Sequence, residues 1–138
     1  MTKDIIHDSV KNALIKDGWT ITADPFPIKY AEFELFADLA AERSPIAAEK
    51  DGEKVVIEIK TFAGPSFVRD LQQALGQYQI YLGLLEIVAP ERILYLAVSS
   101  FIYNDLFTRK AAQVILQRYN LKLLVVNVRE EKIVQWKK

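Results

Sequence analysis

The chain has 138 residues and is 51% hydrophobic, which is enough for one domain with a sizeable core. Its 18 basic and 18 acidic residues balance, so it lacks the basic excess typical of strong non-specific nucleic-acid binding, although this balance does not exclude a local basic groove. It has no cysteine and a single histidine, which excludes disulfides, thiolate zinc sites and multi-histidine metal sites.

The first predicted element is a helix that starts at Thr2 or Lys3 and ends at Asp17, with Gly18 as its C-cap. Its apolar residues recur at helical spacing, and the segment opens into this pattern rather than into a signal peptide. No apolar run approaches the roughly 20 residues of a membrane span. We therefore expect a cytoplasmic protein without a membrane partner.

Four short segments after this helix are expected to be extended. Trp19 to Thr22 suggests a short strand, which the prolines of residues 24–27 should end. We predict further strands over residues 32–40, 46–50 and 54–62, with Asp51-Gly52 as the hairpin turn between the last two. These three strands should form an antiparallel meander.

The second half alternates helices and strands. The expected elements are a long helix from Phe67 to about Ile87, a strand over 92–99, a short helix over 101–107, a helix over 109–119 with Ala112, Ile115, Leu116 and Tyr119 inward, a strand over 122–128 and an edge strand over 133–136. The order α-β-β-β-α-β-α-β-β, with no repeat or linker, predicts a single domain over residues 1–138 of the α/β class, in which helices flank a mixed central β-sheet.

A carboxylate and an ammonium lie in the predicted strand over residues 54–62, directly after its apolar run from Val55 to Ile57. Glu58 and Lys60 are two residues apart, so their side chains point to the same face. Asp38 ends an earlier strand of the same meander and can approach Glu58 if the strands are neighbours. Charged residues seldom occupy such a strand unless they are paired or used.

Two carboxylates beside a lysine suit a hard divalent cation such as Mg²⁺, or Mn²⁺ in its place. The ion, held by Asp38 and Glu58, can stabilise charge on a phosphoryl group and generate hydroxide. Lys60 can then orient the attacking water or stabilise developing charge. This chemistry is the hydrolysis of a phosphodiester bond. The alternative is a structural ion pair, since most isolated Glu-x-Lys pairs on strands are surface salt bridges.

The pattern of Asp38, 19 residues and then Glu58-Ile59-Lys60 resembles the PD-(D/E)XK nuclease signature. Gln77 and Tyr81 extend the resemblance, because RecB-like members carry such a Gln-x-x-x-Tyr pair on the helix after the catalytic strand. The resemblance implies a restriction-endonuclease-like fold, with Gln77 and Tyr81 supporting the site. Both residues are equally well explained as caps on the edge of the core.

Segments along nearly the whole chain resemble the XisH family; they are residues 3–19, 34–39, 47–52, 57–60, 74–78 and 92–98. That family is known from cyanobacteria as controlling factors for excision of the fdxN element during heterocyst development, and it is commonly paired with a partner, XisI. The resemblance implies a role in site-specific DNA rearrangement, with DNA and an XisI-type protein as partners.

Two features favour a rival interpretation, a non-catalytic accessory factor that keeps the nuclease fold and binds XisI or a recombinase. The net charge is zero, and the first helix offers no obvious carboxylate, because Asp8 points nearly opposite its core face and His7 only flanks that face. Glu49 joins the site only if its predicted strand pairs beside that of Glu58.

The long helix is also apolar opposite its core face, at Gly76, Ile80, Leu84 and Ile87. We expect a protein interface there, formed with a second copy of the chain or with the partner, unless the helix over 109–119 covers this face.

Overall fold

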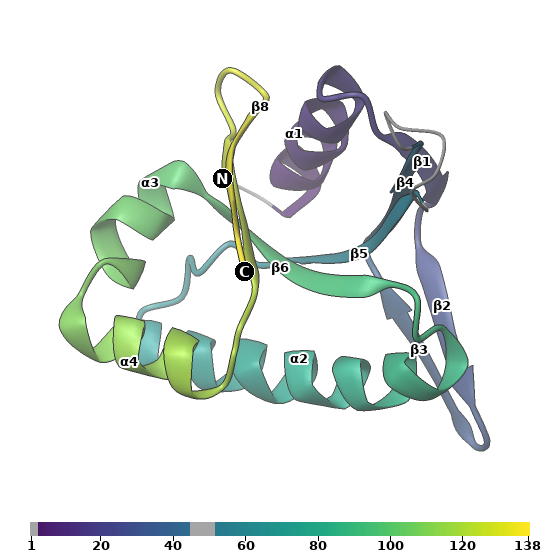
Figure 1. Cartoon of the computed structure of the whole chain (residues 1–138). Helices are drawn as coiled ribbons and strands as arrows, with labels where there is room; N and C mark the ends of the chain where they lie inside the picture. The colour runs from purple at the N-terminus through teal and green to yellow at the C-terminus, as the bar shows by residue number, and fades with distance from the viewer. Residues whose placement is uncertain (1–2, 45–51) are drawn as a thin grey trace.

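A six-stranded mixed sheet forms the centre of the computed structural model, which describes residues 3–44 and 52–138 (Figure 1). Its strands, in spatial order, are β1 (Thr20–Ala23), β4 (Leu39–Arg43), β5 (Glu53–Ile59), β6 (Ile93–Ser99), β7 (Leu123–Asn127) and β8 (Lys132–Lys137). A separate two-stranded sheet consists of β2 (Phe26–Tyr30) and β3 (Phe33–Ala37). The helices are α1 (Lys3–Lys16), α2 (Phe67–Val88), α3 (Ser100–Ile102), the π-helix η1 (Tyr103–Phe107) and α4 (Lys110–Arg118).

The three central strands, β5, β6 and β7, run parallel, whereas the outer pairs are antiparallel. Parallel neighbours need a crossover, and α2 supplies it between β5 and β6. The segment α3-η1-α4 supplies the second crossover, between β6 and β7. The carboxyl ends of these three strands therefore lie at the same edge of the sheet, which is where open α/β sheets commonly bind ligands.

Helices cover both faces of the sheet, with α1 on one side and α2 and α4 on the other (Figure 1). The alternation along β5 divides its side chains accordingly. Val55, Ile57 and Ile59 pack in the core under α1, and Val56 packs in the core under α2. Glu58 has the same parity as Val56, so its carboxyl group points toward α2.

The long helix confirms most of the sequence pattern, but Leu84, which was predicted on the outward face, is half-buried and packs against the core. Ser66 caps the helix by accepting the N–H of Arg69 at 3.2 Å. Its buried residues are Ala74, Tyr78, Tyr81 and Leu85. On the opposite side Ile80 and Ile87 are 56% and 58% exposed, so α4 does not cover this face.

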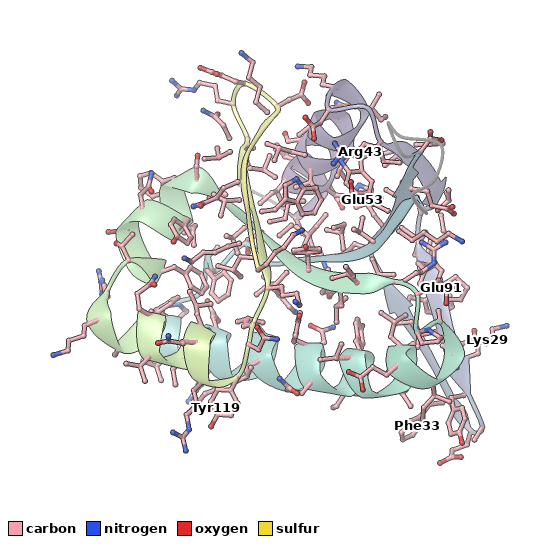
Figure 2. The ribbon with its side chains drawn as sticks, viewed as in Figure 1. Lys29, Phe33, Arg43, Glu53, Glu91 and Tyr119 are labelled. Carbon is pink, nitrogen blue, oxygen red and sulfur yellow. The ribbon has the colours of Figure 1, made fainter. Side chains whose placement is uncertain are left out.

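Tyr119 was predicted to point inward, and this is wrong. Tyr119 is the C-cap of α4 and is 45% exposed, because the helix ends at Arg118 and no longer directs the next side chain to the core. Figure 2 shows Tyr119 at the outer edge of the molecule, on the far side of α4 from the sheet.

The prediction of one strand over residues 32–40 is also wrong. The chain leaves the hairpin strand β3 at Ala37 and enters the central sheet at Leu39 as β4. Asp38 separates β3 from β4. Aspartate is disfavoured within strands, and here its carboxylate accepts a hydrogen bond from the neighbouring strand β5. Consequently β4 pairs directly with β5, and Arg43 at its end donates to Glu53 at 2.9 Å (Figure 2).

The predicted strand over residues 46–50 and its turn at 51–52 fall largely outside the described residues. The prolines did not prevent a strand either, because Pro27 lies within β2. β2 pairs only with β3, and a two-stranded ribbon has a free edge that tolerates the missing N–H of proline. β5 ends at Ile59, earlier than the expected residue 62.

Within residues 3–44 and 52–138, no helix combines the length and the apolar character that crossing a membrane requires.

Candidate functional site

Asp38 and Glu58 meet through the pairing of β4 with β5. Leu39 lies opposite Ile57 in this antiparallel register, so one further step places Asp38 opposite Glu58. Asp38 Oδ2 accepts the backbone N–H of Ile59 at 2.7 Å, which fixes the carboxylate at the end of β5. The two carboxyl groups that the sequence predicted to converge therefore do so.

Glu58 is a buried acid that lacks a full set of hydrogen bonds. Glu58 is 2% exposed, and its Oε1 has no hydrogen-bond partner among the described residues. Burial raises the pKa of the Glu58 carboxyl to about 8, and the neighbouring Asp38 carboxylate adds to the rise. At neutral pH the Glu58 carboxyl therefore holds its proton.

Two lysines from different elements flank this pair. Lys60 follows β5 and remains tied to the sheet, because its backbone N–H donates to Ala97 O at 3.1 Å. Lys3, at the start of α1, places its Nζ 3.4 Å from Asp38 Oδ2. Both ammonium groups oppose the rise in the pKa of Glu58, and Lys3 does so more strongly. Lys3 and Lys60 line one pocket of about 230 Å³, the site pocket, together with Asp70 and Gln73, whereas Asp38 and Glu58 are not part of its lining.

Gln77 and Tyr81 lie on the face of α2 that looks toward the pair. Gln77 Nε2 donates to the Tyr81 hydroxyl at 2.9 Å, and that hydroxyl donates to Phe36 O at 3.0 Å. Burial raises the pKa of the Tyr81 hydroxyl, and the Glu58 carboxylate contributes to the rise. Because Phe36 is two residues before Asp38, this chain of hydrogen bonds fixes the backbone that delivers Asp38 to Glu58.

The first-helix candidates occupy a different cluster. His7 Nε2 lies 2.9 Å from Asp24 Oδ1, and Lys11 Nζ donates to Asp24 Oδ2 at 2.9 Å. The hydrogen bond from Lys11 lowers the pKa of Asp24. His7 also lies 3.5 Å from Asp8, so its contacts are with these carboxylates and not with the pair at β4 and β5. Glu49 lies outside the described residues.

The first helix instead contributes Lys3, for which no place in the site was predicted from the sequence. The signal in the sequence is a lysine one turn before His7 on the predicted first helix. At that position a long side chain reaches past the end of the sheet to Asp38.

The donor set fits a magnesium or manganese ion of the kind held by few protein ligands. Within the described parts of the chain, no group of three or more His, Cys, Asp or Glu side chains could hold a metal. Mg²⁺, however, keeps several waters and is commonly bound through one or two carboxylates plus substrate phosphates. The buried and unpartnered Oε1 of Glu58, beside Asp38, is the oxygen that such an ion would satisfy.

Comparison with known proteins gives matches over almost the full length of the chain. The family model described as XisH protein matches residues 1–134. An XisH family protein from Nostoc punctiforme PCC 73102 is 38% identical, with a TM-score of 0.88, over 98% of this chain and 100% of that chain. An fdxN element excision controlling factor protein from Anabaena variabilis is 37% identical, with a TM-score of 0.87, over 99% of this chain and 100% of that chain.

Among curated proteins, no significant match was found. The family match covers nearly all of the chain, and both solved structures share its fold at more than a third sequence identity. The chain therefore belongs to the XisH family.

Proposed function

We propose that this chain takes part in site-specific DNA rearrangement by cutting phosphodiester bonds at a Mg²⁺-dependent site of the PD-(D/E)XK type on a restriction-endonuclease-like fold. One observation carries the proposal: the buried Glu58 carboxyl faces Asp38 and keeps an unpartnered oxygen, and Lys60 follows two residues later. A rearrangement role is supported by the similar protein from Anabaena variabilis, which is described as an fdxN element excision controlling factor.

In this proposal each residue has a separate task. Asp38 and Glu58 hold the metal, and Lys60 orients the attacking water from the edge of the site pocket. The bound ion supplies Lewis-acid stabilisation of the phosphoryl oxygens and a more acidic water. Gln77 and Tyr81 position Asp38 through Phe36 O and do not touch the metal.

The test is a titration of purified protein with Mg²⁺ or Mn²⁺ on linear, branched and supercoiled DNA. We expect cutting that requires the metal, stops with a chelator and is lost in Glu58→Gln and Lys60→Ala. Lys54→Ala, a lysine earlier on the same strand, is the matched control and should cut normally. Cutting that survives in Glu58→Gln would show that a contaminating nuclease, or another site, is responsible.

The second candidate is a non-catalytic accessory factor that binds a protein, either an XisI-type partner, a recombinase or a second copy of the chain. The outer face of α2 favours it. No charged residue lies between Asp70 and Glu86, and Ile80 and Ile87 are more than half exposed. A charge-free helix face of this kind is typical of the centre of an interface.

We expect this face to join two copies of the chain, and Ile80→Asp to weaken that association by at least about tenfold, because a charge at the centre of an apolar contact cannot be solvated there. Sedimentation or light scattering over a range of concentrations measures the assembly. Val114→Asp, on the similarly exposed surface of α4, is the control. An Ile80→Asp protein that stays folded with unchanged assembly size would contradict the interface.

A further inference from the structure

A second and larger pocket lies beside the site pocket. It has a volume of about 560 Å³ and is formed where β5, β6 and β7 end, by Thr61, Ala63 and residues 99–102 and 127–129, with Ile6 of α1. We call it the strand-end pocket. Thr61 and Ala63 also line the site pocket, so the two hollows share a wall beside Lys60.

The strand-end pocket presents an aromatic ring and a cation on fixed turns. Phe101 is 75% exposed, more than any other large hydrophobic residue that the structure describes. Its turn is held by Ser99, whose Oγ accepts the N–H of Ile102 at 3.1 Å. Arg129 is exposed and its side chain forms no ion pair with a described residue. Asn127 Oδ1 holds the turn around it by accepting the N–H of Glu130 at 3.0 Å.

An exposed ring and an unpaired guanidinium over an apolar hollow match the chemistry of an unpaired nucleotide. Successive bases of single strands stack on aromatic side chains, and arginine contacts their phosphates. The volume is within the range of small-ligand pockets. A base inside a duplex is stacked and paired, so it cannot present its ring face in this way.

We propose that the strand-end pocket holds an unpaired base of the DNA strand being cut, stacked on Phe101, with Arg129 on an adjacent phosphate. This assignment rests on the proposed function, because the shared wall lies directly after Lys60, which would orient the attacking water at the phosphodiester bond to be cut. It deepens that function by naming the substrate class, which is single-stranded or branched DNA with unpaired bases.

The test measures binding apart from cutting. Fluorescence anisotropy in a chelator, with a labelled oligonucleotide, is expected to show tighter binding of single-stranded than of fully paired DNA. Phe101→Ala should weaken single-strand binding about tenfold, and Phe101→Trp should retain it. Phe33→Ala, on the exposed end of the β2–β3 hairpin (Figure 2), should change nothing. Arg129→Ala should lower the dependence of binding on salt concentration. A 2-aminopurine in the strand should lose fluorescence on binding to the wild type and not to Phe101→Ala.

Two results would overturn the assignment. The first is equal binding of single-stranded DNA by the wild type, Phe101→Ala and Phe33→Ala. The second is a change of assembly size in Phe101→Ala without a change in DNA binding, which would make this surface a protein contact. The proposed function fails separately. Stacking on Phe101 without metal-dependent cutting supports the pocket and removes the nuclease, whereas cutting of duplex DNA that ignores Phe101 removes only the pocket.

Discussion

Glu58→Gln should make the protein more stable at alkaline pH while it lowers any metal-dependent cutting by two orders of magnitude or more, on the order of what removal of a principal charge-stabilising group costs. The two effects have one cause. The burial that makes Glu58 a strong metal ligand when ionised also makes its ionised form unfavourable without a metal. Glutamine keeps the shape and removes the ionisation.

The sign follows from proton linkage. The pKa of the Glu58 carboxyl rises from its ordinary value of 4.5 to about 8 in the folded protein. Between these values the folded state holds a proton that the unfolded state has released, so the free energy of unfolding falls as the pH rises. From about pH 5 to about pH 8 the ionisation of this carboxyl should lower the free energy of unfolding by about 2–4 kcal/mol. The larger figure is the limit of about 1.36 kcal/mol for each of the three pH units.

Denaturant unfolding without metal, at several pH values, measures this effect. The difference in stability between Glu58→Gln and the wild type should be small near pH 5 and should grow to the full amount near pH 8. Glu53→Gln is the matched control, because Glu53 lies on the same strand but is exposed. A Glu58→Gln curve that stays parallel to the wild type across this range would mean that Glu58 ionises normally in the folded state.

The elements whose boundaries sequence reasoning predicted well are those with a strong local period. The 22-residue helix α2 has its cap at Ser66, and the apolar runs of β6 and β7 are strands as expected. The β2–β3 hairpin was missed, because two prolines normally argue against a strand and only the absence of a second neighbour makes Pro27 acceptable. Whether β2 has a second neighbouring strand is decided by the tertiary structure, which the local sequence does not reveal.

The site shows the same division. Glu58 and Lys60 share a strand, so the period of two predicts that they share a face, and Asp38 was expected to approach them. The route was different, since Asp38 reaches Glu58 by ending β3 and not from within a long strand. Lys3 lies 35 residues before Asp38 in the sequence and meets it only because α1 packs across the sheet. No spacing rule connects two such positions.

Binding of Mn²⁺ near neutral pH should release close to one proton per ion. The carboxyl of Glu58 is protonated in the free protein, because its pKa is about 8, and a metal ligand must be ionised. Each ion therefore displaces a proton, and the affinity should rise about tenfold per pH unit until the pH reaches the pKa of Glu58 and then level off. An ordinary surface carboxylate pair, ionised already at pH 5, would show neither effect.

Isothermal titration in two buffers of different ionisation enthalpy counts the released protons. Asp38→Asn should abolish binding, because it removes the second carboxylate. Binding of Mn²⁺ without proton release, or equal release by Glu58→Gln, would place the ion elsewhere on the molecule. Either result would separate the metal site from the buried pair, whatever the cutting assay shows.

Removing Lys3 is a control in which the affinity for Mn²⁺ should change in the opposite direction to Asp38→Asn. The Lys3 ammonium lies 3.4 Å from Asp38 Oδ2, so it already occupies a position beside the carboxylate that would bind the metal. Its positive charge therefore repels an incoming ion. Above the pKa of Glu58, where this carboxyl is ionised with or without Lys3, Lys3→Ala should therefore strengthen Mn²⁺ binding by several fold, by an amount limited because the lysine side chain is half exposed and its charge is screened. Lys16→Ala, on the same helix with a similar exposure, should leave the affinity unchanged. If Lys3→Ala raises the affinity for Mn²⁺ and Asp38→Asn lowers it, the ion and Lys3 compete for the Asp38 carboxylate.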